Sequence, residues 1–294
     1  METAFIIASL FIPVFVFIAF YIVPNFSAFF MAFQDKDGRW TADNFVRVYD
    51  TIRNADSDLR IGLKNTLLTF GFNLVLYPFR VLVPYFIYKK IPFSGFYRIV
   101  FFLPSIIFGV ATSLIFAQLV APTGFIAEIV QNVAGLDYTP ELLADSRYAN
   151  KVIFAEMFWF GFPGDLIIWG GTFARIPNEI LEAGRIDGVN WWTEFTKIVV
   201  PMVWPTVGLQ MTLMACGILS STGNVFLLTE GNYGTMTLAC WLTLQLKNGS
   251  GATYGSTNIY NFMSAVGLCM TVIALVIATL VRKYANKAFE EVEF

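Results

Sequence analysis

The sequence predicts an all-α membrane protein with six membrane-spanning helices. Three observations support this fold class: few charged residues, a high mean hydropathy and several long segments without any charge. Of the 294 residues, 56% are hydrophobic and 14% are charged, and the mean hydropathy is +0.63. A soluble domain carries roughly 25% charged residues. The chain therefore has too few charges to cover a surface that faces water on all sides.

The six spans follow from the uncharged segments. An α-helix needs about 20 mostly apolar residues to cross the hydrocarbon core of a bilayer. Arg80, Glu156 and Asp165 are the charged residues that fall inside such segments. We predict one domain, 1–294, with spans at about 5–33, 65–88, 99–121, 152–174, 199–226 and 259–281.

The orientation of these spans is predicted from cations in short loops and near span ends, which tend to stay in the cytoplasm. The short 89–98 loop contains Lys89, Lys90 and Arg98 and no acidic residue. Arg282 and Lys283 follow the last span directly. We therefore predict that this loop, the 173–200 segment and both termini are cytoplasmic. The longer loops 34–64, 122–151 and 230–258 then face outward.

A compact charged segment, 176–201, interrupts the apolar sequence between the fourth and fifth spans. Its residues 179–201 read EILEAGRIDGVNWWTEFTKIVVP. Pro177 suits the first turn of a helix, and Glu179 and Glu182 lie near its positive end. Gly188 is placed to end that helix, because glycine readily adopts the left-handed conformation of a helix stop.

A second short helix is predicted to follow the Gly188 turn. Asn190 can cap its start. Trp191, Phe195 and Ile198 recur at helical spacing and form an apolar stripe. Thr193, Glu194 and Lys197 then lie on the opposite, polar face, and Pro201 and Pro205 mark the turn into the fifth span. The segment is thus predicted to be a helix-turn-helix at the cytoplasmic membrane surface.

Several function classes lack their characteristic residues in this sequence. Histidine is absent, and the three cysteines are scattered without metal-ligand spacing. No GxxxxGK[ST] phosphate-binding loop is present. The net charge of −2 without a basic patch indicates no nucleic-acid partner. We expect neither an enzyme, nor a metal site, nor a cofactor in this chain.

The charged segment also carries a resemblance to a known family. EAGRIDGVNWWTEFTKIVVP (182–201) resembles the EAA signature of ABC importer permeases. The matching positions are Glu182, Ala183, Gly184, Asp187, Gly188, Phe195, Ile198 and Pro201. Two positions depart from the signature: its second alanine is Gly184 here, and the leucine before its proline is Val200.

Weaker matches extend the resemblance along the chain in the expected order. FIPVFVFIAFYIVPNFSAFFMAF, LKNTLL, RIVFFLPSII and LLTEGNYGTMTLACWL look like segments of maltose-type sugar permeases. The last of them resembles the MalF-like subunit more than the MalG-like subunit.

The resemblance implies one half of a membrane path in a bacterial plasma membrane. The expected partners are a MalG-like permease, two cytoplasmic ATPases that bind the ATP, and an extracellular solute-binding protein. Docking of the ATPases would involve Glu179 together with the signature residues Glu182, Ala183, Gly184, Asp187, Gly188, Phe195 and Pro201.

The expected solute is a sugar or oligosaccharide, and four polar residues of the spans could line its path. These are Asp165, Ser220, Ser221 and Asn224. Each also has a structural interpretation: Asp165 could form an ion pair with Arg80, which lies at similar depth, and serine can satisfy helix backbones. Two alternatives to sugar import stay open. One is the same machine carrying glycerol phosphate, a polyamine or a peptide, and the other is a transporter driven by an ion gradient.

Overall fold

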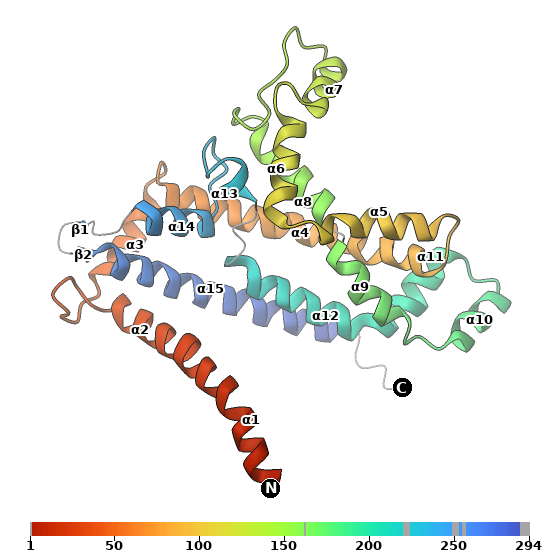
Figure 1. Cartoon of the computed structure of the whole chain (residues 1–294), viewed down its shortest axis with the longest axis horizontal. Coiled ribbons are helices and arrows are strands. Elements are labelled where there is room, and N and C mark those ends of the chain that lie inside the picture. The colour runs from red at the N-terminus through yellow and green to blue at the C-terminus, as the bar shows by residue number, and fades with distance from the viewer. Residues whose placement is uncertain (1, 162, 220–223, 249–252, 255–256, 289–294) are drawn as a thin grey trace. The chain divides into compact units, whose positions relative to one another are not determined.

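The computed structural model describes residues 2–161, 163–219, 224–248, 253–254 and 257–288. The amino-terminal half contains α1 (Glu2–Phe17), the π-helical turn η1 (Ile18–Ile22), α2 (Val23–Ala32), α3 (Asp43–Arg53), α4 (Asp58–Tyr88), α5 (Ser94–Ile106), α6 (Gly109–Val120) and α7 (Phe125–Ala134). The other half contains α8 (Ala149–Phe160), α9 (Pro163–Phe173), α10 (Asn178–Ile186), α11 (Trp191–Thr193), η2 (Glu194–Val199), α12 (Val200–Cys216), η3 (Gly217–Leu219), α13 (Val225–Leu228), α14 (Leu238–Asn248), β1 (Thr253–Tyr254), β2 (Thr257–Asn258) and α15 (Ile259–Ala288). The chain is therefore helical almost throughout (Figure 1).

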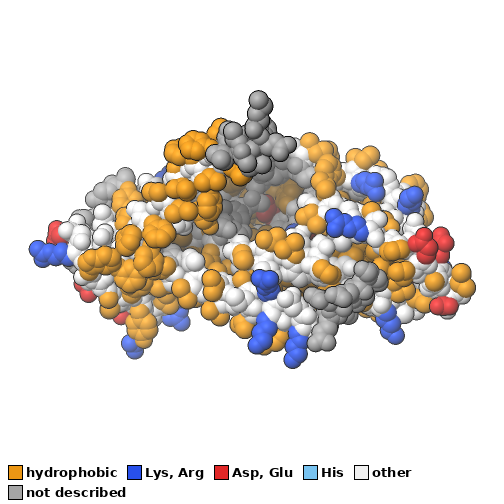
Figure 2. All heavy atoms as spheres, turned by 90° about the horizontal axis from the view of Figure 1, so that it is seen from below, with side chains coloured by type: hydrophobic (Ala, Val, Ile, Leu, Met, Phe, Trp, Pro, Cys, Tyr) orange, Lys and Arg blue, Asp and Glu red, His pale blue; other side chains and the backbone are white. Residues whose placement is uncertain are grey.

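The prediction of a helical membrane protein is confirmed. Among the described residues, five helices are long and apolar enough to cross a membrane, at 9–32, 58–88, 109–134, 191–219 and 259–287. The helices α8 and α9 together pass the same test, although they are bent by 41° where they meet. Counting this bent pair as one span gives six. Hydrophobic side chains also cover much of the face shown in Figure 2.

Two predicted boundaries differ from the structure. The predicted span 99–121 is not one helix, because α5 ends at Ile106 and α6 begins at Gly109. Pro104 lies just before this break and removes one intrahelical hydrogen bond. The predicted turn at Pro201 is also absent, since one helix runs from Trp191 to Leu219. The π-helical turn η2 ends just before Pro201, where the hydrogen-bond pattern must change because proline has no N–H.

The chain divides into two compact units, and the first comprises Met1–Arg60 and Leu242–Ile273. Within it, α1, η1 and α2 form an apolar helical stretch whose most hydrophobic 18 residues are all unburied. Two amides hold the loop that follows α2. Asn44 donates to the carbonyls of Ala32 and Gln34 at 2.9 and 2.8 Å, and Asn261 donates to those of Gln34 and Asp35 at 2.8 and 2.9 Å. The loop's buried carbonyls are thereby paired.

The second unit, Ile61–Trp241 and Ala274–Phe294, contains the charged segment and the main core. This core is built from α4, α9 and the helix that starts at Trp191, with Leu181 of α10 packed into it. Its buried residues are Tyr77, Val81, Tyr85, Trp169, Phe173, Ile176, Leu181, Phe195, Val199, Val203 and Val207. The short helix α10 is therefore tied to the ends of the long helices rather than to a separate domain.

Candidate functional site

The helix α10 has the start and stop that the sequence predicts. It begins directly after Pro177 and ends at Asp187. Gly188 follows in the left-handed conformation, with φ +72°. The N–H of Val189 then donates to the carbonyl of Gly184 at 3.0 Å, which closes the turn. Asn190 caps the next helix, since its Oδ1 accepts from the N–H of Thr193 at 2.8 Å.

One face of α10 packs against the protein and the other is open. Leu181 and Gly184 are buried. A Cβ built at Gly184 would lie 3.0 Å from the Cδ1 of Ile198. The departure from the alanine of the EAA signature thus occurs where α10 packs against Ile198.

The open face contains most of the residues that the sequence assigns to docking. Glu179, Glu182, Ala183, Asp187 and Gly188 are all exposed. Ile186 is 87% exposed, although it is a large hydrophobic residue. The exposed edge of α10 therefore combines charged residues with one large apolar side chain.

The base of the charged segment is anchored to α4 by Glu194. This side chain is only 4% exposed, and its carboxylate accepts hydrogen bonds from the Tyr85 hydroxyl at 2.9 Å and from Lys89 Nζ at 2.8 Å. Phe195 is also buried, with its ring centroid 5.0 Å from that of Tyr85. The prediction that Glu194 lies on the polar face opposite the apolar stripe is therefore wrong, because the π-helical turn and the pairing with α4 bring its side chain into the core.

The two predicted docking residues Phe195 and Pro201 thus differ from the others in position. Phe195 belongs to the buried core, and Pro201 lies in the first turn of α12. Phe195 is thus buried, whereas Pro201 is half-buried where the segment joins α12.

Two of the three charged residues inside the spans are paired with each other. Arg80 of α4 and Asp165 of α9 form an ion pair, with side chains that are 23% and 12% exposed. This is the pairing that their similar depth suggests in the sequence. It neutralises two charges that are costly within a membrane when they are alone.

Glu156 forms a second polar cluster, on α8. It is fully buried, and its Oε1 accepts hydrogen bonds from Ser113 at 3.4 Å and from the amide of Asn224. Its Oε2 has no partner among the described residues. Of the predicted path residues, Asn224 therefore contacts Glu156, which the sequence shows as a single acidic residue within an apolar segment. Ser220 and Ser221 lie outside the described residues.

A small cavity lies in the same unit of the chain. It has a volume of about 220 Å³ and is lined by residues of α4, α8, α12, η3 and the segment just before α14. Polar side chains from two of these elements line it: Thr66, Thr69, Asn73 and Thr237. Met157, the residue after Glu156, also lines it. No single helix contains this set, so the sequence pattern could not indicate it.

Three residues with positions of functional interest have no functional role predicted from the sequence. Ile186 carries no prediction at all, Glu194 is predicted to lie on a polar face, and Glu156 is noted only as a charge within a span. For Ile186 a signal existed: it stands between Arg185 and Asp187, off the face that Leu181 and Gly184 share. For Glu194 no local signal existed, because its partners come from a helix more than 100 residues earlier.

Known proteins resemble this chain over nearly its whole length. No protein-family model matches it. It is 26% identical to the osmoprotective compounds uptake permease protein GgtC of Synechocystis, over 92% of this chain and 95% of that protein. It is 23% identical to the multiple sugar-binding transport system permease protein MsmF of Streptococcus mutans, over 95% and 94%. It is 25% identical to the arabinooligosaccharides transport system permease protein AraP of Bacillus subtilis, over 92% and 85%.

Solved structures show the same fold. A chain of a bacterial ABC transporter involved in the import of the acidic polysaccharide alginate superposes with a TM-score of 0.81 and 19% identity, over 97% of this chain and 96% of that one. A chain of the alginate transporter in complex with a periplasmic protein bound to an alginate pentasaccharide gives a TM-score of 0.82 and 20% identity, over 98% and 96%. The relatives that match nearly the whole chain, the shared fold and the helix-turn-helix at 176–201 agree with one another: this chain is similar to the binding-protein-dependent sugar permeases of ABC transporters.

Proposed function

We propose that this chain is a permease subunit of an ATP-driven importer and forms half of the membrane path for a sugar or oligosaccharide. Its partners are a second, MalG-like permease, two cytoplasmic ATPases and an extracellular solute-binding protein. The observation that carries this proposal is the geometry of α10, a short helix with an exposed charged edge and a buried attachment to the spans. ATP is bound by the ATPases, because this sequence contains no phosphate-binding loop of its own.

The attachment of α10 supports a role in transmitting force. Gly184 lies against Ile198 at the start of a long helix, and Glu194 joins that helix to Tyr85 and Lys89 of the α4 end. A displacement of α10 would therefore move two long helices together. Packed side chains and ion pairs of this kind are the physical means by which two sites in a protein are coupled. ATP-driven closure of the ATPases would rock the spans between outward-open and inward-open states.

The solute class is supported by the relatives and by the polar groups inside the spans. MsmF and AraP are named for multiple-sugar and arabinooligosaccharide transport. We assign the path to the cluster of Glu156, Asn224 and Ser113 and to the ion pair of Arg80 with Asp165. Carboxylates and amides of this kind accept and donate hydrogen bonds to sugar hydroxyls. Ser220 and Ser221 stay candidates from the sequence.

The orientation proposed for the chain places α10 and both termini in the cytoplasm. Asn190 is exposed at the start of the helix after α10 and suits a labelling test. In intact cells, Asn190→Cys should resist a membrane-impermeant thiol reagent, whereas inverted vesicles should be labelled. Labelling in intact cells but not in inverted vesicles would reverse the orientation.

Uptake by a strain that lacks this chain tests the function as a whole. The strain should fail to accumulate one labelled solute from a panel of mono- and oligosaccharides, glycerol phosphate, a polyamine and a peptide, and the wild-type gene should restore uptake. Arsenate, which lowers cellular ATP, should abolish this uptake, while a protonophore that leaves ATP intact should not. Loss of uptake of a sugar supports the proposal. Loss of uptake of another panel member instead would show that the chain transports that class of solute. Sensitivity to the protonophore alone would refute ATP-driven import.

A further inference from the structure

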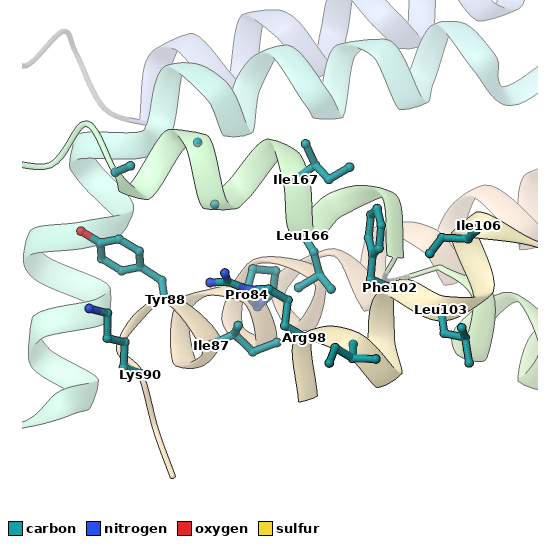
Figure 3. A pocket seen from close by; sticks show the side chains of 14 residues that line it. Pro84, Ile87, Tyr88, Lys90, Arg98, Phe102, Leu103, Ile106, Leu166 and Ile167 are labelled. Atoms are coloured by element: carbon teal, nitrogen blue, oxygen red, sulfur yellow. The ribbon is translucent and has the colours of Figure 1, made fainter. Parts of the chain in front are cut away.

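An apolar groove lies between the end of α4, the helix α5 and the helix α9. Its volume is about 740 Å³. Figure 3 shows Lys90 and Tyr88 at one end, Arg98 nearer the middle, and Leu103 and Ile106 at the other end. The apolar part is lined by Pro84, Ile87, Ile99, Phe102, Leu103, Ile106, Leu166, Ile167 and Ala174.

The length of the groove suits one acyl chain. Its lining runs from Arg98 to Ile106 on α5 and from Leu166 to Ala174 on the α9 side. Eight residues of helix extend about 12 Å, which is close to the roughly 15 Å depth of hydrocarbon in one leaflet. The groove is therefore nearly as long as the hydrocarbon of one leaflet is deep.

Two glycines keep the groove open. Gly170 and Gly171 both line it, and a Cβ built at either would meet no atom within 4 Å. The space beside α9 is thus vacant rather than filled by neighbouring side chains. A flexible hydrocarbon chain could occupy it without displacing any residue.

The charged end of the groove is positive and unpaired. Lys90 and Arg98 are exposed and form no ion pair among the described residues, and no described carboxylate lines the groove. Tyr88 lines the same end and Tyr97 precedes Arg98. Tyrosine is enriched where a membrane meets water. This end therefore has the composition of a headgroup level.

We propose that this groove binds one anionic phospholipid. The phosphate lies between Lys90 and Arg98, and one acyl chain runs past Phe102 and Ile106 toward the middle of the membrane. Basic pockets between membrane helices are the usual form of such headgroup sites. The proposal goes beyond solute import and requires only that the chain resides in a membrane.

Native mass spectrometry of the purified 294-residue chain tests the headgroup contact. The chain is titrated with phosphatidylglycerol, and separately with phosphatidylethanolamine of the same acyl composition. Each cation near a membrane surface contributes about fivefold in affinity, so Lys90→Gln with Arg98→Gln should weaken phosphatidylglycerol binding about 25-fold. Binding of phosphatidylethanolamine should change much less. Arg282→Gln with Lys283→Gln is the matched control, because it removes an exposed cation pair from the end of another helix.

A second variant tests the acyl chain. Gly170→Leu fills the groove and should reduce retention of both lipids, whereas Gly95→Leu should leave it unchanged. Gly95 is the matched control because it is exposed on α5, outside the groove, and its Cβ would also meet nothing within 4 Å. Equal wild-type affinity for the two lipids, or equal effects of the two leucine variants, would overturn the proposal. The proposal would also be overturned if a cysteine introduced by Gly171→Cys cross-linked to the second permease while a photoactivatable phosphatidylglycerol failed to label the groove.

Discussion

Replacement of Glu194 by glutamine should loosen the attachment of the charged segment to α4. The wild-type carboxylate accepts one hydrogen bond from Tyr85 and one from Lys89, at 2.9 and 2.8 Å. Glutamine has nearly the same shape and can still accept from Tyr85. It cannot neutralise Lys89, whose side chain is 21% exposed. The variant therefore removes the charge while leaving most of the packing in place.

The expected loss of stability follows from these contacts. A hydrogen bond to a charged group contributes about 1.5–3 kcal/mol, and breaking a fully buried ion pair costs about 3–5 kcal/mol. Because Lys89 keeps partial access to solvent, we expect Glu194→Gln to lower the free energy of unfolding by about 2 kcal/mol. Tyr85→Phe removes one hydrogen bond and should cost about 1.5 kcal/mol. The double variant should cost less than the sum, because Glu194→Gln already weakens the hydrogen bond from Tyr85 by removing the charge of its acceptor.

The assay is thermal unfolding of the purified chain in detergent, combined with co-purification of the ATPases. Glu182→Gln is the matched control, because Glu182 is exposed on α10 and forms no ion pair among the described residues. It should change stability by less than about 0.5 kcal/mol but weaken retention of the ATPases. If the two glutamine variants unfold at the same temperature, Glu194 is not the anchor that the structure indicates.

Four further predictions concern single positions. Gly188→Val should cost about 1–2 kcal/mol, because φ +72° is left-handed, and should abolish uptake while the protein still reaches the membrane. Gly184→Ala should raise the melting temperature slightly, since alanine favours the helix by about 1 kcal/mol and the contacted isoleucine methyl can rotate away. Asp165→Asn should lower the amount of folded protein on a membrane blot, and Arg80→Gln should partly restore it; unchanged stability with altered solute preference would instead favour direct solute contact. Burial raises the pKa of the Cys240 thiol to about 11 and leaves the side chain inaccessible, so maleimide labelling of the folded protein at pH 7 should be slow and should become fast on unfolding.

The helical architecture could be predicted from sequence because its signals are long and redundant. Uncharged stretches of more than 20 residues have few alternatives to membrane helices. The glycine stop at Gly188 and the asparagine cap at Asn190 are also local signals, and both are present in the structure. The pairing of Arg80 with Asp165 could be anticipated because opposite charges at similar depth in a membrane usually form ion pairs.

The position of Glu194 could not be predicted by the same means. An apolar stripe is inferred by assuming 3.6 residues per turn, and the π-helical turn Glu194–Val199 departs from that period. The partners Tyr85 and Lys89 lie 109 and 105 residues earlier in the chain. A local pattern contains no information about a contact at that separation, so an acid beside a lysine in a charged stretch looks like a solvated surface.

The break between α5 and α6 illustrates a different limit. Membrane helices tolerate proline when neighbours satisfy the freed carbonyls, so Pro104 alone does not indicate whether a helix bends or ends. In α4 the helix continues through both Pro78 and Pro84. In α5 it ends two residues after Pro104, and Gly109 opens the next helix. The outcome depends on packing around each proline, which the sequence does not specify locally.

The charges of segment 176–201 are explained by two separate requirements in the proposed importer. A docking surface must contact a soluble partner, and the exposed charges of α10 around Ile186 meet that need. The same segment must also transmit a displacement of α10 to the membrane helices. This requires contacts that fix its position relative to α4. Buried apolar contacts alone would allow sliding, whereas the carboxylate of Glu194 is held at both oxygens by groups of the α4 end. The segment therefore has both exposed acidic residues, which serve recognition of the partner, and one buried acidic residue, which serves attachment to the spans.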